Sequence, residues 1–202
     1  MVHPPILLAS SSPYRQTLLA KLGLPFRMAS PDIDESPAPG ETARELALRL
    51  AREKATALAA AWPGHWIIGS DQVASLADGE NLSKPGNYAT AFDQLSRSSG
   101  GTVTFFTGLA LLNADTGQLQ THCEIFNAHF RELSVEEIDH YLRADKPFDC
   151  AGSFKMEGLG IALFDFLEGR DPDSLVGLPM IALTDMLRNW GLNPLLAAKA
   201  GC

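Results

Sequence analysis

Apolar and polar residues occur in blocks over the first forty positions, and the blocks predict a strand, a helix and a loop. Residues 6–9, ILLA, form a continuous apolar run of the kind found in buried strands. Ser12 is a good N-cap and Pro13 suits the first helical position, so a helix should follow and end near Gly23. Residues 25–40 are rich in proline and acidic side chains and predict a loop.

Later helices are predicted from the residues that would cap them. Thr42 with Glu45 and Ser134 with Glu137 both fit the capping box, and Asn87 is a third N-cap. We expect the helix after Thr42 to reach about position 61. The helix after Asn87 should end near position 96, and the helix after Ser134 near position 144.

The remaining apolar runs predict strands. Residues 66–70, WIIGS, form a second buried-strand candidate, which ends at Asp71. Residues 102–112 and 118–131 predict two long antiparallel strands joined by a turn. A further strand candidate covers residues 160–166, and a last helix should open at Pro179 and end at Gly191.

These elements predict an α/β fold with a mixed sheet and flanking helices. The buried strands at the front require parallel crossovers, whereas the hairpin in the middle is antiparallel. We therefore expect two lobes around a central cleft, where small-molecule sites tend to form.

Composition and charge narrow the class of partner. The chain has 202 residues, of which 46% are hydrophobic and 20% charged, as in folded soluble proteins. We expect one domain over residues 1–202, with a disordered tail from about residue 196. The formal net charge of −8 disfavours a nucleic-acid polymer or an anionic membrane as partner, but a small anionic substrate needs only a few basic residues. A homodimer stays open.

Signals for export and several familiar catalytic motifs are missing from the sequence. Cys123, Cys150 and Cys202 fit neither a disulfide framework nor a zinc site, and residues 1–5 lack the basic region of a signal peptide. No apolar run approaches the length of a membrane span, so we expect a cytoplasmic protein. The histidines show no metal-ligand spacing, and neither a P-loop nor a G-x-S-x-G motif occurs.

The segment from Ser10 to Arg15 is a candidate anion site. It lies where a predicted strand meets a helix N-terminus, so backbone N–H groups, the hydroxyls of Ser10 and Ser12 and the helix dipole converge there. Arg15 follows one turn into the helix. The alternative is that Ser12 only caps the helix and the other serines fill a turn.

Three lysines are candidates for binding phosphate groups. Lys54 is aligned with three leucines of its predicted helix, which places its ammonium on or beside the apolar stripe. A boundary lysine with its charge in water is the alternative. Lys84 and Lys155 lie in predicted loops, and each could equally be a solvated surface residue.

Carboxylates form the remaining candidates. Asp71 follows a buried strand, a position from which open α/β sheets project catalytic groups, although a turn or cap aspartate has the same pattern. Asp32, Asp34 and Glu35 cluster on the proline-flanked loop. Such a cluster suits a hard divalent cation such as Mg²⁺, and it suits a solvated acidic loop as well.

A set of short motifs occurs in a fixed order along the chain. They are ASSSPYR at 9–15, DE at 34–35, REKA at 52–55, GSDQ at 69–72, KP at 84–85, AGS at 151–153, EG at 157–158 and VGLP at 176–179. In this order they resemble the Maf-like family of nucleotide pyrophosphatases, from Ile6 to Leu195. One motif would mean little, but the ordered set is specific.

The resemblance implies a hydrolase that splits a nucleoside triphosphate into the monophosphate and pyrophosphate, with a fold related to the inosine-triphosphate pyrophosphatases. It implies Asp71 as the proton acceptor, and Glu35 together with Asp71 at a divalent cation, Mg or Mn. The positions matched to phosphate binding are Ser10, Ser12, Arg15, Lys54 and Lys84. Lys155 is added to them on its chemistry alone.

Within the family, the chain is similar to the branch that acts on 7-methyl-GTP. Tyr14 after Ser-Pro, Gln72 after the aspartate and Glu157 before glycine carry this likeness. Glu157 could accept hydrogen bonds from the cationic base, and Tyr14 could stack on it. Two alternatives stay open: a pyrophosphatase that prefers dTTP or UTP, and a nucleotide-binding regulator of cell division or septum formation with little turnover.

Overall fold

The first strand of the chain lies between two parallel neighbours in the computed structural model, which describes residues 3–156 and 158–197. Strand β1 (Ile6–Ala9) pairs with β2 (Phe26–Ala29) on one side and with β3 (Trp66–Leu76) on the other. All four β1 residues are buried, as a continuous apolar run requires when both faces of a strand are covered.

The other strands complete a mixed sheet of seven strands in the order β2-β1-β3-β5-β6-β7, with β4 beside β3. These strands are β4 (Asn81–Leu82), β5 (Thr102–Asn113), β6 (Leu119–Phe130) and β7 (Phe164–Gly169). β4 pairs with β3, and β7 with β6, in the antiparallel sense. The predicted mixed sheet with flanking helices is therefore confirmed.

The chain divides into two compact units. The described part of unit 1 comprises residues 3–71, 107–124 and 171–197, and that of unit 2 comprises residues 72–106, 125–156 and 158–170. Because the division falls within β3, β5 and β6, neither unit is a continuous segment, and the single domain stays a prediction.

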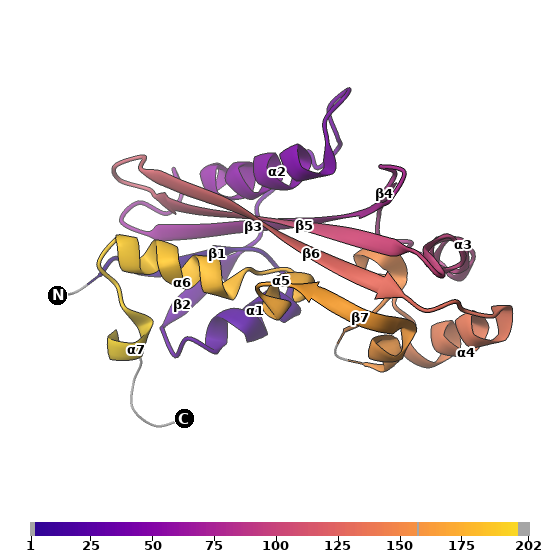
Figure 1. Ribbon diagram of the computed structural model, residues 1–202. Coiled ribbons are helices and arrows are strands. Elements are labelled where there is room, and N and C mark those ends of the chain that lie inside the picture. Colours follow the sequence, from indigo (N-terminus) through magenta and orange to yellow (C-terminus); the bar gives the residue numbers. More distant parts are fainter. Residues whose placement is uncertain (1–2, 157, 198–202) are drawn as a thin grey trace. The chain divides into compact units, whose positions relative to one another are not determined.

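In unit 1, helices cover both faces of the parallel strands (Figure 1). Leu7 and Ala9 of β1 share a cluster with Ala51 of α2 (Ala43–Ala57). The alternate β1 residues belong to a second cluster with α1 (Pro13–Ala20) and α6 (Met180–Asn189). The short helices α5 (Pro172–Val176) and α7 (Pro194–Ala197) also belong to this unit.

Two glycines allow α2 to lie very close to the sheet. A Cβ atom added at Gly69 of β3 would lie 2.1 Å from the carbonyl oxygen of Ala51, and one at Gly108 of β5 would lie 2.1 Å from that of Ala47. Any side chain at these positions would push the helix away. Because α2 lies this close to β3, Lys54 of α2 is next to Asp71, two residues after Gly69 in β3.

Unit 2 has its own core under helices α3 (Tyr88–Ser98) and α4 (Val135–Asp145) and the short 3₁₀ helices η1 (Ala151–Ser153) and η2 (Leu159–Leu163). Four phenylalanines meet edge to face in it, with ring centroids 4.7–6.2 Å apart. They are Phe105, Phe130, Phe154 and Phe164.

Several predicted boundaries need correction. β2 lies within the segment predicted to be a loop. Residues 160–163 of the last strand candidate belong to η2 instead, and β3 continues five residues beyond Asp71, to Leu76. α2 ends at Ala57 instead of near position 61. Residues 196 and 197 of the predicted disordered tail belong to α7, and the rest of that tail lies outside the described residues.

Candidate active site

The centre of the candidate site is a buried ion-pair cluster in unit 1. The ammonium of Lys54 lies 2.5 Å from Oδ1 of Asp71 and 2.6 Å from Oε1 of Glu35. Lys54 and Asp71 are 7% and 8% exposed, whereas the Glu35 side chain is mostly exposed. The alternative of a boundary lysine with its charge in water does not hold, because the ammonium itself contacts a buried carboxylate.

The first helix begins as its sequence predicts. The Ser12 hydroxyl accepts a hydrogen bond from the backbone N–H of Arg15 at 3.4 Å, and Pro13 occupies the first turn. The Ser10 hydroxyl in turn accepts from the backbone N–H of Ser12 at 3.1 Å. Ser12 is thus a cap, as the alternative interpretation required, and the role of these serines in phosphate binding stays a prediction.

Arg15 belongs to the same electrostatic environment as the ion-pair cluster. Burial lowers the pKa of the Arg15 guanidinium, while the negative charges of Asp71 and Glu35 act in the opposite direction. Six of the predicted site residues of unit 1 therefore form two neighbouring groups of three. One comprises Ser10, Ser12 and Arg15 of the turn before and within α1, and the other is the cluster of Lys54, Asp71 and Glu35.

A backbone carbonyl holds Arg15 in place. Its Nε donates to the carbonyl oxygen of Gly177 at 2.8 Å, and the hydroxyl of the fully buried Ser70 lies 2.9 Å from the same oxygen. The Ser70 hydroxyl also lies 2.8 Å from the Gly108 carbonyl oxygen. Ser70 and Gly177 belong to motifs singled out in the sequence, but sequence analysis gave neither a role.

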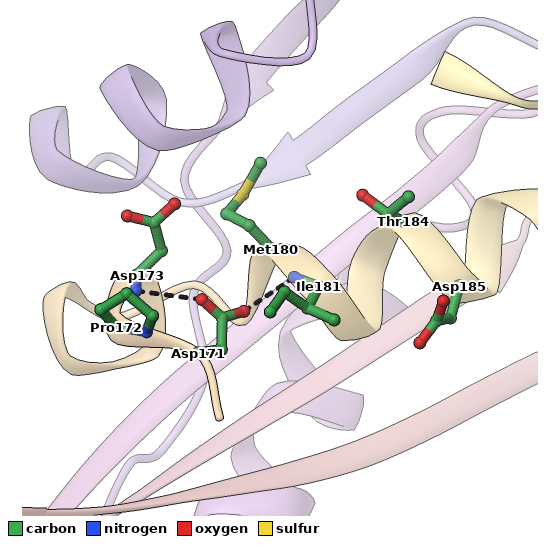
Figure 2. Close-up of a pocket in the computed structure, with 7 residues that line it drawn as sticks. All are labelled: Asp171, Pro172, Asp173, Met180, Ile181, Thr184 and Asp185. Atoms are coloured by element: carbon green, nitrogen blue, oxygen red, sulfur yellow. Dashed lines mark hydrogen bonds between the residues drawn. The ribbon is translucent and has the colours of Figure 1, made fainter. Parts of the chain in front are cut away.

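The turn that carries Gly177 is anchored by a buried aspartate. Asp171 is 1% exposed, and its carboxylate accepts hydrogen bonds from the backbone N–H groups of Asp173 at 3.0 Å and Ile181 at 2.7 Å. Figure 2 shows both contacts. The pocket drawn there is lined by residues 171–173, 180, 181, 184 and 185 of unit 1, none of which is a predicted site residue.

The loop that carries Glu35 is tied to α2 by an arginine. Arg49 Nη2 donates to the carbonyl oxygen of Ser36 at 2.9 Å, and Arg49 Nε donates to the Glu41 carboxylate at 2.7 Å. The hydrogen bonds from Arg49 and then from the Ala38 N–H lower the pKa of Glu41 to about 2. Glu35 therefore extends from a loop whose backbone is held by the same helix as Lys54.

The candidate lysines of unit 2 are placed differently. Lys84 is exposed. The ammonium of Lys155 lies 3.1 Å from the carbonyl oxygen of Asp145, 3.4 Å from that of Lys146 and 3.8 Å from the Asp149 carboxylate. Lys155 thus neutralises the carbonyl end of α4, and phosphate binding by Lys84 and Lys155 stays a prediction.

The residues predicted to select the base are distributed over both units. Tyr14 lies in the first turn of α1 in unit 1, and Gln72 is the first residue of unit 2. Both are partly buried. Glu157 lies outside the described residues, so its place in the structure is not assigned.

Among residues 3–156 and 158–197, no group of three or more histidine, cysteine, aspartate or glutamate side chains is arranged to hold a metal ion. The pair formed by Glu35 and Asp71 nevertheless fits a cation in one respect, since both carboxylates already converge on a single positive group.

Within residues 3–156 and 158–197, no helix has both the length and the apolar character that a membrane span needs.

The fold is shared with a solved structure of low sequence identity. The Ham1 protein from Staphylococcus aureus matches with a TM-score of 0.52 and 12% identity, over 93% of this chain and 100% of that one. At this identity the likeness concerns the fold alone. It agrees with an α/β protein built on a mixed sheet.

The family is shown by two further comparisons. The family model described as "Maf-like protein" matches residues 5–190. A protein from Pseudomonas syringae pv. tomato (strain ATCC BAA-871 / DC3000), named 7-methyl-GTP pyrophosphatase, is 58% identical over 190 residues, which cover 94% of this chain and 98% of that protein. The chain belongs to the Maf-like family, as its ordered motifs indicated.

Proposed function

We propose that the protein hydrolyses a nucleoside triphosphate, 7-methyl-GTP above all, to the nucleoside monophosphate and pyrophosphate. The observation that carries the proposal is the Lys54–Asp71 pair, a buried cation and a buried carboxylate 2.5 Å apart, with Arg15 in the same electrostatic environment. The name of the 58% identical relative supports both the reaction and the substrate.

The charges of the cluster suit an attack on a phosphate chain. Asp71 is the proton acceptor for a water that attacks the α-phosphorus, and the bond from that phosphorus to the bridging oxygen breaks to release pyrophosphate. Arg15 and Lys54 supply positive charge against which the phosphates are held. A protein that only binds the nucleotide would not need Asp71 as a proton acceptor.

A divalent cation, Mg or Mn, is part of the proposal. Glu35 and Asp71 would hold it, because carboxylate oxygens are the preferred ligands of such hard cations. When bound, it would neutralise the charge of the triphosphate and of the leaving pyrophosphate. Lys54 would then have a phosphate oxygen as an alternative partner to the two carboxylates that it contacts here.

The phosphate contacts are proposed to come from Ser10, Ser12, Arg15 and Lys54 of unit 1, with Lys84 and Lys155 of unit 2. We place the protein in the cytoplasm, where nucleoside triphosphates are available, and leave a homodimer as a prediction.

The first experiment is a screen of purified protein against 7-methyl-GTP, GTP, dTTP and UTP, with separate assays for pyrophosphate and phosphate. We expect pyrophosphate, fastest from 7-methyl-GTP. Binding without pyrophosphate release would favour the regulator of cell division or septum formation.

Base selection by Tyr14, Gln72 and Glu157 gives the substrate prediction. A carboxylate at Glu157 accepts hydrogen bonds from the cationic 7-methylguanine base, so Glu157→Gln should lower kcat/KM for 7-methyl-GTP about 10-fold or more, as expected for the loss of a charge-assisted contact. The effect on UTP should be smaller. Faster wild-type turnover of UTP or dTTP than of 7-methyl-GTP would contradict this choice of base and leave the pyrophosphatase reaction standing.

A further inference from the structure

The turn at residues 176–179 is the VGLP motif of the sequence, and the proposed reaction assigns no role to its residues. Gly177 ends α5 with φ +112°, in the left-handed region that favours glycine. Its carbonyl oxygen accepts the hydrogen bond from Arg15 Nε. We propose that Gly177 is a positioning residue, whose carbonyl fixes the guanidinium of Arg15 for a chain of phosphate groups.

The chemistry of the guanidinium explains why this contact matters. Arg15 uses Nε on the carbonyl, and a guanidinium has two further nitrogens that can donate to oxygen atoms of an anion. A lysine has no equivalent second edge, so it could carry the charge but could not be held in the same way. The carbonyl thus fixes the direction of a cation that would otherwise move on a long side chain.

The absence of a side chain at Gly177 is also required by Arg15. A Cβ atom added there would lie 3.3 Å from Arg15 Nε and 3.6 Å from Nη2. An alanine would therefore both strain the left-handed backbone and press on the guanidinium. The glycine serves the turn and the arginine at the same time.

Two buried side chains fix the position of the Gly177 carbonyl group: Asp171 through the backbone around it, and Ser70 at the oxygen itself. The Asp171 carboxylate receives backbone N–H groups on either side of the turn, from Asp173 at the start of α5 and Ile181 at the start of α6 (Figure 2). The Ser70 hydroxyl lies within hydrogen-bonding distance of the Gly177 oxygen. Since Ser70 directly precedes Asp71, one carbonyl links the arginine to the strand that carries the proposed proton acceptor.

The inference rests on the proposed function only for the nature of the ligand, so it is tested by binding rather than by turnover. The probe is inorganic tripolyphosphate, and its Kd is measured by calorimetry for the wild type, Gly177→Ala, Arg15→Ala and the double variant. Gly177→Ala alone should weaken binding about 10-fold, within the range of coupling found between residues in contact. In the Arg15→Ala background the same change should have less than about a 2-fold effect.

Two results with the Gly177→Ala variant would overturn the inference. One is an equal loss of binding from Gly177→Ala in both backgrounds, and the other is wild-type binding by a folded Gly177→Ala protein. Failure of the wild type to bind tripolyphosphate would overturn it as well. If the wild type binds tripolyphosphate but releases no pyrophosphate from any nucleoside triphosphate, the proposed function fails. The positioning role of Gly177 is then decided only by the tripolyphosphate affinities of the wild type, the two single variants and the double variant.

Gly191→Ala is the matched control. Gly191 also belongs to unit 1 and has φ +85°, but a Cβ atom there would meet no atom of residues 3–156 or 158–197 within 4 Å. It should lower Tm through backbone strain and leave the Kd unchanged, and a Kd change equal to that of Gly177→Ala would count against positioning.

A second variant covers the case in which Gly177→Ala does not fold. Arg15→Lys keeps the positive charge and removes the Nε donor that the Gly177 carbonyl accepts. We expect it to lose most of the binding that Arg15→Ala loses. Wild-type affinity of Arg15→Lys would show that the carbonyl contact does not matter.

Discussion

The two units place their candidate phosphate-binding cations in contrasting ways. In unit 1, Lys54 is buried and its ammonium contacts two carboxylates, while Arg15 is held by a backbone carbonyl. In unit 2, Lys84 is exposed and Lys155 contacts the carbonyl end of α4. The two candidate cations of unit 1 are therefore held in fixed positions, whereas of the two candidate lysines of unit 2 one is exposed and the other contacts its own helix.

The difference indicates where chemistry takes priority over stability. A buried ion pair contributes little net stability, because desolvation of the two charges offsets their attraction, and apolar residues of similar size often stabilise a protein more. The Lys54–Asp71 pair is therefore hard to explain by folding alone. The contact between Lys155 and α4 needs no such explanation, since cations stabilise helix C-termini.

The largest expected effect comes from the carboxylate of unit 1. Asp71→Asn should lower kcat about 10²–10⁴-fold, because it removes a general base with almost no change in volume. Substrate binding should be unchanged or tighter, since a negative charge facing phosphates is lost. Steady-state kinetics with 7-methyl-GTP measure both, and Asp93→Asn at an exposed position of α3 is the control. Near-wild-type turnover of Asp71→Asn would remove the proposed role.

The next effect is on stability, and it tests whether the charges of Lys54 and Asp71 stabilise the folded protein as a pair. Lys54→Met keeps much of the side-chain volume but leaves the buried Asp71 carboxylate without its counter-charge, which should cost about 3–5 kcal/mol of folding free energy. The double variant Lys54→Met/Asp71→Asn removes both charges and should regain most of that loss. Urea unfolding of the three proteins measures the differences. A double variant no more stable than Lys54→Met would argue against the pair as a unit.

A smaller effect separates the two lysines of unit 2. Lys84→Ala should raise KM for the triphosphate about 10-fold if its ammonium meets a phosphate, as loss of a charged hydrogen bond predicts, without a change in Tm. Lys155→Ala should lower stability by about 0.3–1 kcal/mol through the end of α4. Parallel kinetics and thermal melts distinguish the two. A KM increase for Lys155→Ala equal to that for Lys84→Ala would assign Lys155 to the phosphates as well.

Local signals made much of the fold predictable from the sequence. The capping boxes at Thr42 and Ser134 and the Asn87 cap lie within one turn of the helices that they begin, and all three are confirmed. β2 was missed because its four residues, FRMA, carry no clear pattern. Its strand conformation comes from pairing with β1, a contact that composition does not report.

The site shows the same division between local and distant information. The motifs around Arg15, Lys54 and Asp71 predicted these side chains as one group, and the structure brings the three into one unit, while their roles in the reaction stay predictions. The part played by Gly177 could not be predicted in this way. It acts through a backbone carbonyl on a residue 162 positions away, and glycine has no side chain whose chemistry could point to it.

The smallest effect concerns the loop that carries Glu35, and it depends on pH. The hydrogen bond from Arg49 lowers the pKa of Glu41 to about 2 from the usual 4.5, so the folded protein favours the ionised carboxylate. The stabilisation is therefore complete above about pH 4.5 and is lost as the pH falls towards about 2. Glu41→Gln should lower Tm at pH 6, and its difference from the wild type should shrink on acidification. Thermal melts from pH 6 to 2.5 measure this, with Glu136→Gln at an exposed position of α4 in unit 2 as the control. A constant difference across this range would mean that Arg49 holds the loop without the charge of Glu41.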